Sequence, residues 1–167
     1  MATFTEVARG VAFMRCGIVN VAVLGDRSRW ILVDAALPGY GPSIRRAAEE
    51  RFGPAPRPSA IVLSHGHFDH VGALDELLAA WDVPIFAHTL EMPYLTGRSP
   101  YPPPDPLVGR GGFAVMSRLL PRGPYDFGGR VHQLPRPTAL DHPPASSRTD
   151  PSRSSIATVP ASSPGNG

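Results

Sequence analysis

Lysine is absent from this sequence, and cysteine is nearly so. All 16 basic residues among the 167 are arginines, they are scattered, and the net charge is only +2, so no basic stripe indicates a nucleic-acid partner. The single thiol, that of Cys16, excludes both an intrachain disulfide framework and a cysteine zinc cluster. No apolar run approaches the ~20 residues of a membrane span, and residues 1–10 lack the pattern of a signal peptide. We therefore expect a cytoplasmic protein with no membrane partner.

Large apolar and aromatic side chains become scarce toward the C-terminus. The last aromatic residue is Phe127, and residues 136–167 contain six prolines and seven serines but only three large aliphatic side chains. Such a stretch cannot bury enough surface to offset the entropy that ordering it costs. We therefore expect a folded domain at residues 1–134 and a Pro/Ser-rich disordered tail at residues 135–167.

Within the expected domain, short apolar runs alternate with helix-like segments, which predicts an α/β fold. The pattern predicts strands at residues 7–15, 18–24, 30–33, 60–63 and 83–87, and helices at residues 43–52 and 71–81. Ser43 is the expected N-cap of the first helix. The continuous apolar runs at 60–63 and 83–87 are typical of strands that are covered on both faces. A proline-rich connector at 101–106 and a short helix at 113–120 are expected to follow.

The candidate functional residues come directly after the run at 60–63, in the segment Ser64-His65-Gly66-His67-Phe68-Asp69-His70. His65 and His67 are two apart in a nearly extended segment and point the same way, while Gly66 lets the backbone turn without a side chain in the site. Asp69 and His70 lie at the start of the next helix and return to the same point. Imidazole nitrogens with a carboxylate suit zinc, with iron and manganese as alternatives. This spacing at the carboxyl end of a strand predicts a metal site.

The pattern of three histidines and one aspartate at these positions resembles the signature of the metallo-β-lactamase-fold hydrolases. The resemblance extends from about residue 20 to about residue 134. It implies an αββα sandwich made of two similar halves. The expected fold class is therefore α/β, namely the N-terminal part of such a sandwich followed by a disordered tail.

Residue by residue, the resemblance implies that His65 and His67 bind a first metal and that Asp69 and His70 bind a second, both commonly zinc. Asp34 is implied as a supporting residue behind the site. In such a site two metals hold a bridging hydroxide that attacks a small-molecule ester, thioester, lactone or phosphodiester, and Asp69 orients it as the catalytic residue. The fold alone does not choose among these substrates.

Three ligands of the family's complete site have no counterpart in this sequence. They are a third histidine on the first metal, an aspartate that bridges the metals, and a last histidine on the second. His142 is the alternative third ligand by sequence distance, but it lacks the glycine and threonine context of the family. We expect a chain that is truncated or frame-shifted after about residue 135, with impaired hydrolysis. The alternative is a non-catalytic remnant, or a metal-binding half-domain that associates with another chain.

A half-sandwich has one sheet face without the second sheet that covers it in the complete fold. A large apolar surface is then exposed to water. Self-association through this uncovered sheet face is therefore expected, together with reduced stability.

Other notable residues have simpler structural interpretations. His88, after the run at 83–87, is expected to be structural rather than a ligand, and His132 is expected to be an exposed strand residue. Cys16 is expected to be a small core residue. For Asp34, a role in ending the strand before it is the alternative to the supporting role.

Overall fold

The computed structural model describes most of the N-terminal part of the chain, at residues 2–101, 123 and 125–135. Residues Met1–Leu134 make up one compact unit. Three expected features lie outside the described residues: the connector after Tyr101, the helix at 113–120 and the tail after residue 135.

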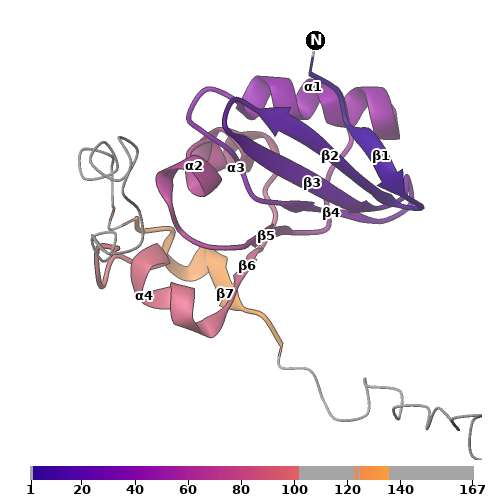
Figure 1. Cartoon of the computed structure of the whole chain (residues 1–167). Helices are drawn as coiled ribbons and strands as arrows, with labels where there is room; N and C mark the ends of the chain where they lie inside the picture. Colours follow the sequence, from indigo (N-terminus) through magenta and orange to yellow (C-terminus); the bar gives the residue numbers. More distant parts are fainter. Residues whose placement is uncertain (1, 102–122, 124, 136–167) are drawn as a thin grey trace, which may run out of the picture. The chain divides into compact units, whose positions relative to one another are not determined.

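One seven-stranded sheet runs through this unit, and its strands lie in the order of the sequence (Figure 1). The strands are β1 Thr5–Ala8, β2 Val11–Cys16, β3 Val19–Gly25, β4 Trp30–Val33, β5 Ile61–Leu63, β6 Ile85–Ala87 and β7 Val131–Gln133. The strands β1 to β4 pair antiparallel, and from β5 onward each strand is parallel to the one before it. Parallel neighbours need crossover connections, which helices supply here. The expected α/β class is confirmed.

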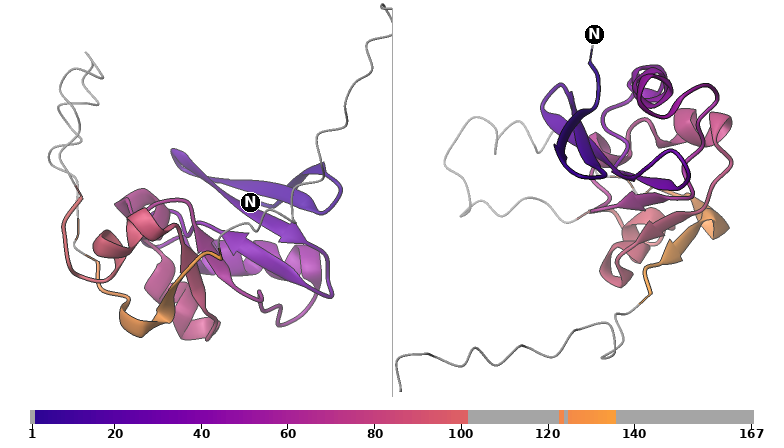
Figure 2. Two further views of the ribbon diagram at one scale, coloured as in Figure 1. Left: turned by 90° about the horizontal axis from the view of Figure 1, so that it is seen from below. Right: turned by 90° about the vertical axis from the view of Figure 1, so that its right-hand side faces the viewer.

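Helices accompany the sheet, and Figure 2 shows the longest of them standing to one side of it. They are α1 Gly41–Phe52, α2 Phe68–Val71, α3 Leu74–Ala80 and α4 Met92–Leu95, with the short 3₁₀ helices η1 Thr89–Glu91 and η3 Gly128–Arg130. The helices and alternate strand residues form one buried core, whose largest members include Met14, Leu32, Ile44, Ile61, Leu63, Leu74, Leu77 and Ile85. At its edge the ring of Trp30 stacks on Phe52 at 4.4 Å and meets Trp81 edge-on at 5.7 Å.

The strand expected at residues 7–15 is in fact two strands. The first ends at Ala8 and the second begins at Val11, because Gly10 between them has a φ of 73° that glycine adopts without strain. The carbonyl of Gly10 accepts a hydrogen bond from the N–H of Gly25 at 2.8 Å, which fixes the turn against β3. The polar and apolar alternation continues across this turn, so periodicity alone does not show it.

The first helix begins earlier than expected, and Ser43 is not its N-cap. Tyr40 occupies the N-cap position without a side-chain bond, and Pro42 lies in the first turn, where its fixed φ suits a helix. The N–H of Gly41 donates instead to the carboxylate of Glu76 on α3, at 3.1 Å. The cap comes from a distant residue, which local sequence signals do not reveal.

The helix expected at residues 71–81 is divided into α2 and α3. Gly72 still has helical φ and ψ, but its N–H donates to the carbonyl of Ala36 at 2.8 Å, and the backbone departs from helical angles at Ala73. Helix α2 thus starts earlier, at Phe68, and it contains the last two residues of the motif. The expected apolar face is confirmed in α3, where Leu74, Leu77 and Leu78 are buried.

The central strands are not covered on both faces as their continuous apolar sequence suggests. In β5 and β6 the middle residues, Val62 and Phe86, are partly exposed, while the residues on either side of each are buried. Within the described residues, the helices therefore cover one face of the sheet at these strands, and the side chains on the opposite face are only partly buried.

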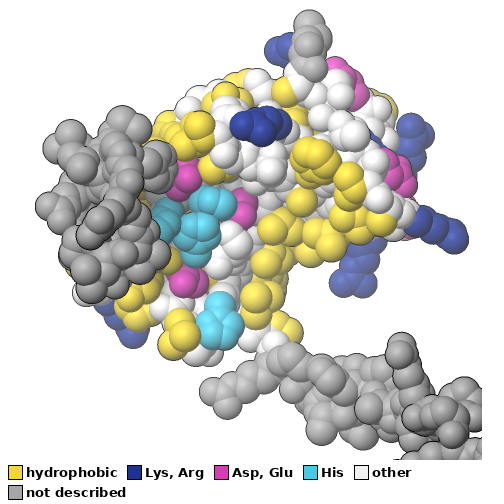
Figure 3. Space-filling view, viewed as in Figure 1, with side chains coloured by type: hydrophobic (Ala, Val, Ile, Leu, Met, Phe, Trp, Pro, Cys, Tyr) yellow, Lys and Arg dark blue, Asp and Glu magenta, His cyan; other side chains and the backbone are white. Residues whose placement is uncertain are grey.

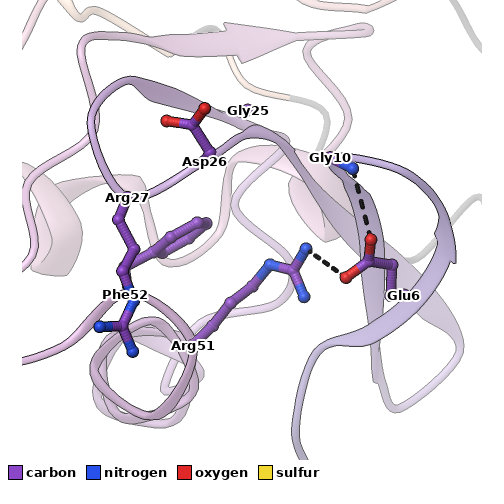
Figure 4. A pocket seen from close by; sticks show the side chains of 7 residues that line it. All are labelled: Glu6, Gly10, Gly25, Asp26, Arg27, Arg51 and Phe52. Carbon is purple, nitrogen blue, oxygen red and sulfur yellow. Dashed lines mark hydrogen bonds and ion pairs between the residues drawn. The ribbon is translucent and has the colours of Figure 1, made fainter.

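A surface pocket of about 280 Å³ lies where the C-terminal end of α1 meets the first strands (Figure 4). Arg51 reaches across it to Glu6, with 3.0 Å between Nη2 and Oε2. This pocket is separate from the motif residues. None of the helices in the described part of the chain has the length and apolar character that a membrane span requires.

Candidate metal centre

The motif residues lie where β5 ends and α2 begins. Ser64 follows the last residue of β5, His67 occupies the N-cap position of α2, and Asp69 and His70 lie within that helix. The extended φ and ψ of His67, −71° and 151°, end the strand-like segment, and the helix then turns the last two residues back. The motif thus lies at the carboxyl end of a parallel strand, where the sequence predicts it.

Three imidazoles and one carboxylate gather there, and His65, His67, Asp69 and His70 are called the histidine cluster below. The ring of His65 lies 4.0 Å from that of His70 and 4.7 Å from that of His67, centroid to centroid. Asp69 Oδ2 lies 3.8 Å from His70 Nε2. In the space-filling view histidines gather beside acidic side chains on the open surface of the molecule (Figure 3).

Asp34 contacts two residues of the motif segment, Ser64 and His70. It follows β4, is only 6% exposed and has a positive φ of 63°, a conformation that aspartate tolerates better than most residues. Its carboxylate accepts hydrogen bonds from the N–H and the hydroxyl of Ser64, at 2.8 and 2.7 Å, and lies 2.9 Å from His70 Nδ1. These contacts leave Nε2 of His70 as the nitrogen that faces the cluster.

The surroundings push the pKa values of two histidines in opposite directions. Burial, with added repulsion from His70 and His67, lowers the pKa of His65 and thus favours the neutral form of its imidazole. The hydrogen bond to Asp34 raises the pKa of His70 despite its burial. A neutral imidazole has a free lone pair, and a carboxylate partner orients and strengthens a histidine ligand.

Two residues from later in the chain, Glu91 and Tyr101, contact the tight turn between His65 and His67. The N–H of Gly66 lies 3.0 Å from Glu91 Oε2 and 3.1 Å from the Tyr101 hydroxyl, and this hydroxyl donates a short hydrogen bond to the same carboxylate. The Tyr101 ring lies 4.2 Å from the His67 ring. A Cβ on Gly66 would approach Leu95 Cδ2 to 3.0 Å and Tyr101 Cε2 to 3.1 Å, so both side chains would have to shift to admit it.

The donor atoms of the cluster are of the types that bind a divalent metal. Imidazole nitrogen and carboxylate oxygen are zinc ligands, and the carboxylate behind His70 is the usual support of such a ligand. The donor atoms do not yet converge: in the described residues, no group of three or more His, Cys, Asp or Glu side chains is arranged so that it could hold an ion. Binding therefore requires the side chains to turn toward a common point.

Neither of the other two histidines in the described part of the chain joins the cluster. His88 accepts a hydrogen bond from the N–H of Leu90 at 3.3 Å and caps η1, in agreement with its expected structural role. His132 lies exposed on β7, as expected. His142 lies outside the described residues. Cys16 is fully buried in the core, which confirms that expectation too.

Three residues around the cluster have no signal in the sequence. Ser64 precedes the histidines but acts through Asp34, which is 30 positions away. Glu91 and Tyr101 reach Gly66 from 25 and 35 positions along the chain. Only the fold brings such distant residues together.

The comparisons with known proteins agree with this geometry. The family model described as the metallo-beta-lactamase superfamily matches residues 14–150. The chain is 41% identical over 133 residues to the probable metallo-hydrolase YflN of Bacillus subtilis, a match that covers 78% of this chain and 50% of YflN. It is 44% identical over 62 residues to the probable metallo-hydrolase YybB of the same organism, of which 28% is covered. The chain thus spans at most about half the length of these relatives.

Solved structures share the fold. The crystal structure of MEM-A1, a subclass B3 metallo-beta-lactamase from a soil metagenome library, matches 80% of this chain and 46% of its own with a TM-score of 0.56 and 19% identity. BJP-1, a subclass B3 metallo-beta-lactamase of Bradyrhizobium japonicum, matches 61% of this chain and 38% of its own with a TM-score of 0.51 and 23% identity. The expected N-terminal part of the sandwich is confirmed.

Proposed function

This chain belongs to the metallo-β-lactamase superfamily, and from that premise we propose that it is a metal-dependent hydrolase of a small-molecule ester, thioester, lactone or phosphodiester. The observation that carries the proposal is the packing of the His65 ring against both His67 and His70, with Asp69 beside them. Membership of the family supports hydrolysis as the reaction class, and the donor set supports a metal, with zinc favoured over iron or manganese.

The residues of the histidine cluster divide into two ligand pairs. His65 and His67 would hold one metal ion, while Asp69 and His70 would hold a second. A divalent metal bound there supplies Lewis-acid polarisation of the scissile carbonyl or phosphoryl oxygen and lowers the pKa of water toward neutrality. Asp34 keeps the proton of His70 on Nδ1 and thereby leaves Nε2 free to bind.

Asp69 has a second role in the proposal, as the catalytic residue. Its carboxylate lies at the start of α2, 3.8 Å from His70 Nε2, so one oxygen can bind metal while the other accepts a hydrogen bond from the attacking water. A water molecule held in this way has its lone pair directed at the substrate. In this proposal Asp69 thus both binds metal and orients the attacking water.

A hydrolysis screen tests the proposal. The full chain is incubated with a thioester, a lactone and a bis-phosphodiester at added zinc, together with the variants Asp69→Ala and Asp75→Ala. Asp75 lies exposed on α3 and serves as the matched control. We expect zinc-dependent turnover that Asp69→Ala abolishes and Asp75→Ala leaves intact. Turnover that persists in Asp69→Ala would refute the assignment.

A second candidate function is a non-catalytic metal-binding half-domain that associates with another chain. The partly exposed apolar side chains of Val62 on β5 and Phe86 on β6 favour it, because apolar surface of this kind can be buried against another chain. Zinc binding without turnover of any of the three substrates would support this candidate over the hydrolase.

A further inference from the structure

The turn between His65 and His67 contains a buried backbone N–H with two acceptors from later in the chain. Gly66 is buried, and its N–H lies 3.0 Å from Glu91 Oε2 and 3.1 Å from the Tyr101 hydroxyl. The same hydroxyl donates a hydrogen bond to Glu91 Oε2. A buried N–H that loses its acceptors costs free energy, because no water replaces them. The three groups therefore restrain one another.

The restrained N–H belongs to the peptide group that joins His65 to Gly66. This group is planar, so its orientation depends on ψ of His65 and φ of Gly66. Glycine limits its own φ less than any other residue does, so the local sequence leaves this turn loose. The bonds to Glu91 and Tyr101 supply the missing restraint. Because the two histidines lie on either side of the turn, its conformation sets the direction of both side chains.

The ring of Tyr101 adds a restraint on the side chain of His67. The centroid of this ring lies 4.2 Å from that of His67 and 4.2 Å from that of Tyr94, at interplanar angles of 47° and 31°. His67 is exposed, and an exposed side chain normally moves rapidly among its rotamers. Packing against Tyr101 limits this motion. Tyr101 thus contacts both the backbone of the turn and one of the proposed ligands.

The segment that contains Glu91 is itself fixed in the fold. It forms η1 and leads directly into α4. The N–H groups of Tyr125 and Phe127 donate to carbonyls of α4 at 3.1 and 3.0 Å. Leu95 of α4 is fully buried, and its Cδ2 lies 3.0 Å from where a Cβ of Gly66 would be. The turn is therefore packed against a helix that has its own attachment to the rest of the unit.

A role as a metal ligand is the alternative for Glu91, because its carboxylate lies near the histidine cluster. Its Oε2 accepts hydrogen bonds from the N–H of Gly66 and the hydroxyl of Tyr101. A metal ion at this oxygen would compete with both donors and so weaken the bonds that restrain the turn. The contacts therefore favour a role in holding the turn over a role in binding the ion.

We propose that Glu91 and Tyr101 are positioning residues that fix the turn at Gly66 and keep the rings of His65 and His67 together, so that both can bind one metal ion. The two rings lie 4.7 Å apart. This inference rests on the proposed function, which assigns the two histidines to the same ion. Residues that orient metal ligands from outside commonly change metal affinity ten- to a hundredfold.

Nuclear magnetic resonance of the metal-free full chain tests the positioning itself. Hydrogen exchange of the Gly66 amide and the three-bond couplings that define χ1 of His67 are measured in the wild type and in Glu91→Ala. We expect the amide of the variant to exchange roughly tenfold faster, and the couplings to approach values averaged over rotamers. Glu91→Gln keeps an oxygen that can accept both hydrogen bonds and should restore both measurements.

Titration with Co²⁺, followed by its visible absorption, tests the consequence for metal binding. Glu91→Ala should weaken Co²⁺ binding roughly tenfold. Glu91→Gln also lacks the negative charge but keeps the acceptor, so it should bind Co²⁺ nearly as well as the wild type. Equal weakening in the two variants would overturn the inference, because the loss of a charge or of a ligand would then explain the effect.

Two further variants guard against misinterpretation. Tyr101→Phe removes the hydroxyl but keeps the ring, so the Gly66 amide should exchange faster while the His67 couplings stay unchanged. It replaces Glu91→Ala if circular dichroism shows that this variant is unfolded, and unchanged amide exchange in it would then overturn the inference. Leu90→Ala, next to Glu91 and at a 69% exposed residue, is the control and should change no measurement.

The two measurements separate a failure of this inference from a failure of the proposed function. A wild type that binds no Co²⁺ would refute the metal centre, and with it both the proposed function and the inference. A wild type that binds Co²⁺, with Gly66 exchange and His67 couplings unchanged in folded Glu91→Ala, would overturn the inference alone.

Discussion

The imidazole of His70 and the carboxylate of Asp34 form a pair, with 2.9 Å between Nδ1 and Oδ2, although 36 residues separate them in the chain. Asp34 is buried directly after β4, and His70 lies in the helix that follows β5. The pairing of these two parallel strands therefore brings the carboxylate beneath the histidine cluster.

Replacing Asp34 by asparagine removes the main cause of the raised pKa of His70. In the wild type the hydrogen bond to Asp34 holds the pKa of His70 above its ordinary value of 6.5, and in Asp34→Asn we expect the pKa to fall. Histidine resonances followed over pH measure both values. An unchanged His70 midpoint would contradict the pairing, and Asp75→Asn is the control.

The same pair makes the stability of the metal-free protein depend on pH. Because the pKa of His70 is raised on folding, its stabilisation is fully present below pH 6.5 and is lost as the pH rises through the folded value. Asp34→Asn should therefore lower the free energy of unfolding more at pH 5.5 than at pH 8.5. Urea unfolding at the two values measures the difference, and an equal loss at both would contradict it.

Gly72 occupies a position with no room for a side chain. A Cβ there would collide with the ring of Pro38 and approach the carbonyl oxygen of Phe68 to 2.6 Å. Gly72→Ala should therefore lower the free energy of unfolding by about 1–3 kcal/mol. Gly129→Ala is the control, because a Cβ there has nothing within 4 Å and should change stability by less than about 1 kcal/mol.

The thiol of Cys16 should be unreactive in the folded protein. Burial raises its pKa to about 11, so almost no thiolate is present at pH 8, and the side chain is fully enclosed. Iodoacetamide should label the denatured chain at least a hundred times faster than the native one. Comparable rates would show that the first strands open readily.

The histidine cluster could be predicted from the sequence because its members lie within six positions of one another. Local backbone geometry brings His65, His67 and His70 together, and no distant contact is needed. The supporting role of Asp34 is implied by the family resemblance, and in the structure its carboxylate lies 2.9 Å from His70 Nδ1.

The other parts of the site and the fold depend on contacts between distant residues. Glu91 and Tyr101 reach Gly66 only through the packing of η1 and the segment after α4. The turn at Gly10 and the break at Gly72 interrupt patterns that look continuous in the sequence, because a backbone hydrogen bond to a distant strand or loop fixes each of them. Periodicity shows which residues are buried, but it does not show where such bonds divide an element.

Zinc content is the most direct test of the histidine cluster as a metal centre. The wild-type chain, His67→Ala and His132→Ala are equilibrated with zinc, freed of excess by gel filtration and measured by plasma mass spectrometry. His132 is exposed on β7, outside the cluster, and serves as the control. We expect zinc in the wild type, an equal content in His132→Ala and a several-fold lower content in His67→Ala. Equal zinc in His67→Ala and the wild type would contradict the assignment of the metal centre.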